Sequence, residues 1–256
     1  MYNAPVGALS VTPLGGLGEI QPGDDLAQLL CDAICRQGLK VGSRDVLVVA
    51  QKAVSKAENR YVTLSSVPVS PEAARLAAIT RKDPRLVALV LSESTEVLRS
   101  KPDVLIVRHR LGYVMANAGI DRSNVTGADR VLLLPRNPDE SAARLHSELA
   151  ALLGVGPAVV VSDSFGRPWR KGVTNVALGA AGLPALIDRR GEIDRNGRKL
   201  EVTEVAFADL IASAAGLVMG EGSEGVPAAL LSGLNWSAAP RPADSLLRPL
   251  QEDLFR

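Results

Sequence analysis

The segment PAVVVSDS (157–164) is the feature that most limits how this chain can fold. Its unbroken apolar run, followed by an acid and hydroxyl residues, is typical of a strand buried on both faces. The run DVLVVA (45–50) has the same character and continues directly into the polar segment QKAVSKAENR (51–60). We therefore expect buried strands whose ends carry polar residues into a loop at 51–60, where ligand sites commonly form.

Helices and hairpins surround these two strands. Asp24 or Asp25 can cap a helix over 22–38, which Gly38 ends. Apolar spacing predicts further helices at 71–82, 83–94, 138–153, 174–182 and 203–215, and strands at 103–110, 112–118 and 130–135, with the first two in a hairpin and another hairpin around 189–200. This mixture favours an α+β (mixed α/β) fold over a doubly wound parallel sheet. We expect one two-lobed domain over 1–256, with a Pro-rich surface tail at 235–256.

Composition excludes several classes of protein. With 46% hydrophobic residues among 256, the chain can bury a full core without disulfides. The formal charge of +1 leaves no electrostatic footprint for nucleic acid or an anionic membrane. Cys31 and Cys35 are expected to be small core residues in a reducing compartment. No signal peptide and no apolar stretch of about 20 residues occur, so we expect a cytoplasmic protein.

Four short segments combine acidic, hydroxyl, basic and glycine residues near strand ends. They are NAGIDRSN (117–124), SDSFGRPWRKG (162–172), MGEGSEG (219–225) and QKAVSKAENR (51–60). Carboxylates and hydroxyls suit hard divalent cations, glycine lets backbone amides approach phosphate, and lysine adds a point charge. Each segment alone is more often an ordinary turn or a solvated face. No Ser-His-Asp or Cys-His set is visible, and His109 and His146 lie apart.

Taken together and in order, longer segments resemble one family, the F420-0:gamma-glutamyl ligases. They are GLGEIQPGDDL (16–26), VVAQKAVSKAENR (48–60), RLGYVMANAGIDRSN (110–124), VSDSFGRPWRKGVTNVALGAAGL (161–183) and EVTEVAFADLIASAAGLVMGEGSEG (201–225). The resemblance implies a mixed α/β fold assembled as an intertwined homodimer, without the fused nitroreductase-like domain of some relatives. It also implies a ligase that uses GTP, two divalent cations (Mg²⁺ or Mn²⁺) and often a monovalent cation such as K⁺. Its substrates would be F420-0 and L-glutamate, with further gamma-linked glutamates added in some cases.

The resemblance also assigns residues by position. Asp121 and Asp163 would ligate one metal, Ser164 and Glu221 the second, and no catalytic side chain beyond these ligands is implied. The nucleotide site would be formed by Leu17, Gly18, Glu19, Ile20, Gln51, Lys52, Lys56, Asn124, Met219, Gly220, Glu221, Gly222, Ser223, Glu224, Gly225 and Val226. Arg167, Arg170 and Lys171 are candidates for holding the anionic substrate.

Some positions depart from the family pattern. Ser164 stands where Thr is common, and its hydroxyl keeps the expected role. Asn59 replaces a frequent Gly, and Asn tolerates a left-handed conformation better than most residues. Two other readings remain open: an amide ligase for a different amino acid or F420 precursor, and a nucleotide-binding module without catalysis.

Overall fold

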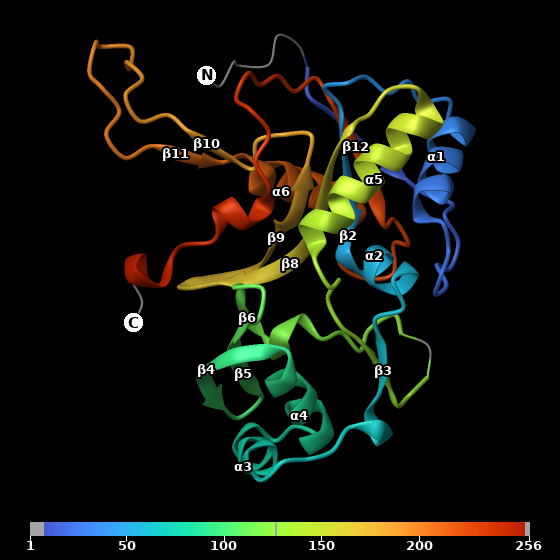
Figure 1. Ribbon diagram of the computed structural model, residues 1–256, viewed down its shortest axis with the longest axis vertical. Coiled ribbons are helices and arrows are strands. Elements are labelled where there is room, and N and C mark those ends of the chain that lie inside the picture. Colours follow the sequence, from blue (N-terminus) through green and yellow to red (C-terminus); the bar gives the residue numbers. More distant parts are fainter. Residues whose placement is uncertain (1–7, 126, 254–256) are drawn as a thin grey trace.

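A five-stranded sheet forms the centre of the computed structural model, which describes residues 8–125 and 127–253 (Figure 1). Its strand order is β1-β12-β2-β8-β9; β2 and β8 run parallel, and the other neighbours are antiparallel. Smaller sheets are formed by β4-β5-β6, β3-β7 and β10-β11, so the predicted mixed α/β class is confirmed. The strands are β1 (Ser10–Leu14), β2 (Val46–Ala50), β3 (Tyr61–Thr63), β4 (Ser94–Lys101), β5 (Val104–His109), β6 (Val114–Ala116), β7 (Arg130–Leu132), β8 (Ala158–Arg167), β9 (Arg170–Ala181), β10 (Leu186–Asp188), β11 (Glu204–Ala206) and β12 (Ala228–Ser232). The helices are α1 (Leu26–Arg36), α2 (Gln51–Ala57), α3 (Pro71–Thr80), α4 (Pro84–Ser92), α5 (Pro138–Leu153) and α6 (Phe207–Met219), with 3₁₀ turns η1 (Leu64–Ser66), η2 (Asn117–Gly119), η3 (Ala243–Leu246) and η4 (Leu250–Glu252).

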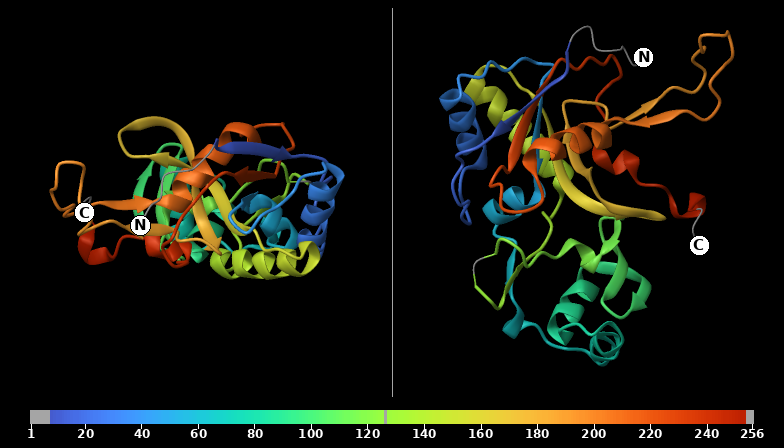
Figure 2. Two further views of the ribbon diagram at one scale, coloured as in Figure 1. Left: turned by 90° about the horizontal axis from the view of Figure 1, so that it is seen from above. Right: turned by 180° about the vertical axis from the view of Figure 1, so that it is seen from behind.

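Helices cover both faces of the central sheet, which explains the continuous apolar runs of β2 and β8. Leu47 and Val159 pack with α1 and α5 in one core, whereas Val48 and Val160 pack with α6 in another. All four side chains are fully buried. Figure 2, seen from above, shows α5 and α6 on opposite sides of the sheet. Within residues 8–125 and 127–253, no helix is long and apolar enough to cross a membrane.

A second part of the molecule lies beyond the carboxyl end of β2, around the sheet β4-β5-β6. Helices α3 and α4 share a core with β5 and β7 there (Figure 1). The Tyr113 hydroxyl joins the two parts, because it donates a 2.6 Å hydrogen bond to the carbonyl of Leu178 on β9. This contact fixes the β5–β6 hairpin beneath the long β8–β9 hairpin.

Several predicted elements are confirmed and others are wrong. The helix at 138–153 and the hairpin at 103–118 are present as α5 and β5–β6. The segment 51–60, predicted as a polar loop, begins with helix α2, whose polar side chains are partly buried. The segment 174–182, predicted as a helix, is strand β9, because it pairs with β8 along its length. The helix predicted at 83–94 ends at Ser92, and strand β4 begins two residues later.

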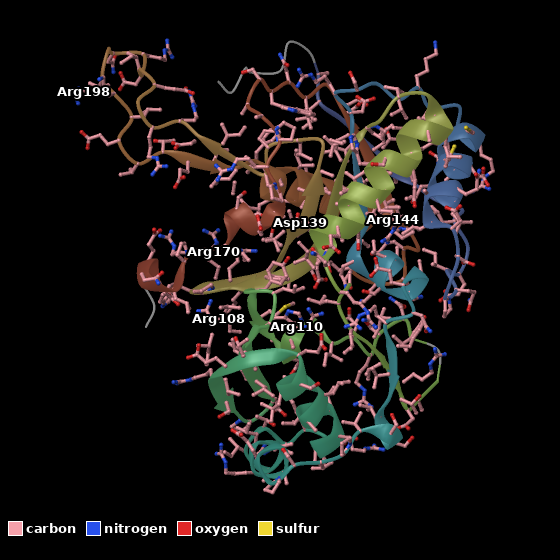
Figure 3. All side chains as sticks on the ribbon, in the orientation of Figure 1. Arg108, Arg110, Asp139, Arg144, Arg170 and Arg198 are labelled. Atoms are coloured by element: carbon pink, nitrogen blue, oxygen red, sulfur yellow. The ribbon has the colours of Figure 1, made fainter. Side chains whose placement is uncertain are left out.

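Two further expectations are corrected. Cys31 is buried, but Cys35 lies exposed on the outer face of α1. The tail is anchored and not only superficial, since Trp236 is 3% exposed and packs on α6. Asp139, at the start of α5 (Figure 3), accepts hydrogen bonds from the backbone N–H groups of Ala180 (2.8 Å) and Ala243 (2.7 Å). One carboxylate thereby joins α5, β9 and the tail.

Candidate functional site

A cavity of about 360 Å³ opens where β2 ends beside the middle of β8, and the glycine-rich loop that follows α6 forms part of its lining. Because β2 and β8 are parallel and Ala50 pairs with Ser162, the carboxyl end of β2 lies beside the middle of β8. The cavity is lined by Gly18, Glu19, Ile20, Ala50, Gln51, Lys52, Ala53, Lys56, Asn124, Ser162, Asp163, Ser164, Asn175 and residues 219–227.

A β-bulge interrupts the pairing of β8 with β9 midway along β8. Val161 pairs with Gly179 but Ser162 pairs with Ala177, so Leu178 is an extra residue in β9. A bulge bends its strand, here β9, and locally disrupts the pairing with the partner strand. Asp163 and Ser164 follow directly and line the cavity.

A left-handed turn delivers Asp121 to the same place. Asn117, Ala118 and Gly119 all have positive φ, at 52°, 53° and 66°. Such backbone is costly for residues other than glycine, and it is concentrated at functional sites. After the turn, Asp121 forms a β-bridge with Leu132, with both N–H···O distances at 2.9 Å.

Two residues of α2 hold the Asp121 carboxylate. Gln51 Nε2 donates to Oδ2 at 2.8 Å, and Lys52 Nζ lies 3.4 Å from Oδ1. Lys52 Nζ also donates to Ser123 Oγ at 3.0 Å. Contacts to both oxygens therefore hold the Asp121 carboxylate, and they come from a helix far from Asp121 in the sequence.

The acids at the cavity perturb one another. Burial and the neighbouring charge of Asp121 raise the pKa of the Asp163 carboxyl to about 7, despite a hydrogen bond from the backbone of Ser164. Burial also raises the pKa of Asp121, against the opposing effect of Lys52. The charge of Glu221 raises both pKa values. Asp121 and Asp163 are thus two half-buried carboxylates close enough to repel each other, with the exposed Glu221 nearby, and a cation would offset this repulsion.

Carboxylates also accept hydrogen bonds from a lysine and a loop amide of the cavity. Lys56 Nζ donates to Glu19 Oε1 at 2.5 Å. On the glycine-rich loop, the backbone N–H of Gly222 donates to Glu224 Oε2 at 2.7 Å. The lysine and the loop amides are the groups expected to bind phosphate.

Nearly all the predicted site residues meet at this cavity. Leu17 packs in the core beside α1 and is not among the lining residues. Asp121 contacts the lining residues Gln51 and Lys52, and the other predicted metal and nucleotide residues line the cavity. Arg167 and Arg170 flank the turn of the β8–β9 hairpin, and neither lines the cavity. Figure 3 labels Arg170. Ser162 and Asn175 also line the cavity and were not assigned to the site from the sequence, although Ser162 begins the candidate segment 162–172.

The donor set fits hard divalent cations. Carboxylates, a hydroxyl and ordered water are the ligands that Mg²⁺ and Mn²⁺ prefer. Ser162 Oγ is buried and has no hydrogen-bond partner, so a polar ligand would satisfy it. Among the residues that the structure describes, no three His, Cys, Asp or Glu side chains surround one point. The arrangement instead suits cations that keep several water or substrate oxygens.

The fold and cavity define a mixed α/β protein with an acidic site beneath a glycine-rich loop, a combination suited to a phosphorylated ligand with cations. Comparison with known proteins narrows this class. The family model for F420-0:Gamma-glutamyl ligase matches residues 16–233. The chain belongs to this family, as the sequence motifs predicted.

Relatives in this family match most of the chain. A coenzyme F420:L-glutamate ligase of Methanopyrus kandleri is 42% identical, over 97% of this chain and 98% of its own length. One of Natronomonas pharaonis is 48% identical over 93% of this chain and 90% of its own. One of Halobacterium salinarum is 49% identical over 83% and 82% respectively.

Proposed function

We propose that this protein is a ligase that joins L-glutamate to the lactyl carboxylate of F420-0 and consumes GTP. The observation that carries the proposal is the family match over 16–233, which includes every segment that converges on the cavity. The relatives named above are coenzyme F420:L-glutamate ligases.

The chemistry requires activation of a carboxylate. A carboxylate oxygen of F420-0 attacks the γ-phosphorus of GTP, GDP leaves, and an acyl phosphate forms. The amine nitrogen of L-glutamate then attacks the acyl carbon, phosphate leaves, and a proton is released. Phosphoryl transfer depends mainly on positioning and electrostatic stabilisation, so a protein nucleophile is not required.

The chain supplies the positioning. Asp121 and Asp163 would hold one divalent cation, and Ser164 and Glu221 a second, with Mg²⁺ or Mn²⁺ as the metal and K⁺ as an accompanying ion. Bound there, the cations would neutralise charge on the phosphate oxygens. Lys52, Lys56 and the amides of residues 219–226 would orient the phosphates, and Asn124 would contact the nucleotide.

The direct test is a reaction of the purified protein with F420-0, L-glutamate, GTP and Mn²⁺, followed by mass spectrometry. We expect a product heavier by one or more glutamyl units, together with GDP, and no product without divalent cation. Consumption of GTP with a different amino acid or precursor would redirect the proposal to a related amide ligase. Nucleotide binding without turnover of any acceptor would indicate a binding module.

We also propose a homodimer. Leu210 and Leu217, 57% and 86% exposed, lie seven residues apart on one face of α6. The β10–β11 hairpin projects from the body (Figure 1) and carries the exposed side chains of Ile193 and Val202. Light scattering after size exclusion should give twice the mass of one chain; the mass of one chain would exclude the dimer at that concentration.

The pKa of Asp163 makes cation binding depend on pH. Because the carboxyl has a pKa of about 7, it is largely protonated below that pH, and a cation must displace the proton. We expect Mn²⁺ affinity to be constant above neutrality and to fall by up to about tenfold per pH unit below it. Calorimetric titration of the nucleotide-free protein across this range measures it. If the Mn²⁺ affinity does not change between about pH 5 and about pH 8, Asp163 is not a ligand of the cation.

Glu224→Gln should bind nucleotide more tightly than the wild type. The Glu224 carboxylate accepts the Gly222 N–H, which we expect to bind a phosphate oxygen, and its charge repels that phosphate. Replacing it by a neutral amide weakens the internal hydrogen bond and removes the repulsion. The Kd for GTP should therefore fall by about three- to tenfold. Glu201→Gln, an equal charge change in the β10–β11 loop, is the control. An unchanged or weaker affinity of Glu224→Gln would mean that the carboxylate does not compete with the nucleotide.

A further inference from the structure

Ser55 carries a buried hydroxyl that does not line the cavity but is connected to it. Its side chain is 0% exposed, and that of Gln51, one helical turn earlier, is 2% exposed. Ser55 Oγ donates to Gln51 Oε1 at 3.0 Å, and Gln51 Nε2 donates to Asp121 Oδ2 at 2.8 Å. A continuous chain of hydrogen bonds thus runs from the interior of α2 to one oxygen of a cavity acid.

The donor and acceptor roles in this series of hydrogen bonds are fixed by chemistry. An ionised carboxylate only accepts hydrogen bonds, so the NH₂ end of the Gln51 amide must face Asp121. The oxygen end is then turned into the protein, where a buried acceptor without a donor is costly. Ser55 is the donor that meets this need. The spacing of four residues places both side chains on the same face of α2.

The second oxygen of Asp121 has a looser contact. Lys52 Nζ lies 3.4 Å from Oδ1, and it also donates to Ser123. The side chain of Lys52 is 30% exposed, so water competes for its ammonium group. The better-defined restraint on the carboxylate is therefore the buried path through Gln51.

We infer that Ser55 is a positioning residue for the Asp121 carboxylate, acting through Gln51, and that it raises the affinity of this carboxylate for a divalent cation. The inference rests on the proposed function, in which Asp121 holds a cation. Hydrogen-bonded partners behind a metal ligand restrict its orientation, and their loss typically weakens metal binding 10- to 100-fold.

The test is Mn²⁺ binding to the nucleotide-free protein, measured by the electron paramagnetic resonance signal of free Mn²⁺. Four proteins are compared: wild type, Ser55→Ala, Gln51→Leu and the double variant. We expect Ser55→Ala to weaken Mn²⁺ binding about tenfold. In the Gln51→Leu background, Ser55→Ala should cause no further loss, because the path from the hydroxyl to Asp121 is already broken.

A matched control separates positioning from general destabilisation. Thr80 is another fully buried helical hydroxyl, which donates to the carbonyl of Leu76 at 2.8 Å in the α3–α4 part of the molecule. Thr80→Val should lower the unfolding midpoint and leave Mn²⁺ affinity unchanged.

The outcomes are distinguishable. Wild-type affinity in Ser55→Ala, or an equal loss in both backgrounds, would overturn the role of Ser55 while leaving the cation site in place. If Ser55→Ala does not fold, Gln51→Leu alone decides, and unchanged Mn²⁺ affinity there would overturn the inference. A wild-type protein that binds no Mn²⁺ would overturn the proposed cation site itself.

Discussion

Asp163→Asn should lower kcat/KM for ligation by at least about 10³-fold, equivalent to roughly 4 kcal/mol of transition-state stabilisation. The carboxylate lies midway along β8, near Asp121 and in the lining of the cavity. An amide has the same shape but no charge, and it is a much poorer ligand for a hard cation. The loss should appear in steady-state rates measured with saturating Mn²⁺ and GTP.

The same substitution should not weaken the fold. Burial and Asp121 raise the pKa of Asp163, so its ionised form is unfavourable in the metal-free protein. A neutral amide removes that repulsion, and we expect the unfolding midpoint of the metal-free variant to be unchanged or higher. A combination of lost activity and retained stability is the signature of a functional carboxylate.

Asp209→Asn is the matched control. Asp209 is also half-buried with a raised pKa, and its Oδ1 accepts the Ala177 N–H at 2.9 Å. It lies on α6 and does not line the cavity. An asparagine oxygen can accept the same bond, so activity should stay within about threefold of the wild type. Near-full activity in Asp163→Asn would exclude Asp163 from the proposed cation site.

The sequence predicted correctly those elements whose burial is reflected in the pattern of their own apolar residues. The strand at 157–164 is continuously apolar because helices cover both faces, and the helix at 138–153 keeps one apolar stripe toward the sheet. The segment 174–182 has no such distinguishing pattern of apolar residues. Its Ala and Gly residues are compatible with a helix or a strand, and pairing with β8 decides between them. The predicted loop at 51–60 is wrong because Gln51, Ser55 and Lys56 are buried polar residues, which hydropathy assigns to solvent.

The sequence predicted which residues form the candidate site, but it did not predict the contacts that hold them in place. Asp121, Asp163 and Glu221 follow recognisable motifs, and the structure brings their segments to one cavity. The contact between Gln51 and Asp121, which are 70 residues apart, depends on the left-handed turn at 117–119 and the bridge to Leu132. Ser55 and Asn175 carry no local signal, since their roles arise only from packing between elements.

Gly179→Ala should be strongly destabilising although Gly179 does not line the cavity. A Cβ at this position of β9 would lie 2.0 Å from the carbonyl oxygen of Pro138 and 2.8 Å from the backbone nitrogen of Asp139. Both neighbours are backbone atoms in the first turn of α5, so no side-chain rotation can make room. Asp139 also binds the adjacent Ala180 N–H at 2.8 Å, which fixes α5 against β9 at this point. We expect a loss of about 3 kcal/mol or more in the free energy of unfolding.

Urea denaturation compares this variant with Gly166→Ala on the partner strand β8. Gly166 does not have positive φ, and a Cβ there meets nothing within 4 Å. Its substitution should change the free energy of unfolding by no more than about 0.5 kcal/mol. Comparing the two variants separates the effect of the clash between the Gly179 position and α5 from the general effect of replacing a glycine in a strand. If Gly179→Ala unfolds at the same urea concentration as the control, then β9 and α5 can separate without cost. In that case the Asp139 contacts to β9 and the tail would not restrain the position of the β8–β9 hairpin, which carries Asp163 and Ser164.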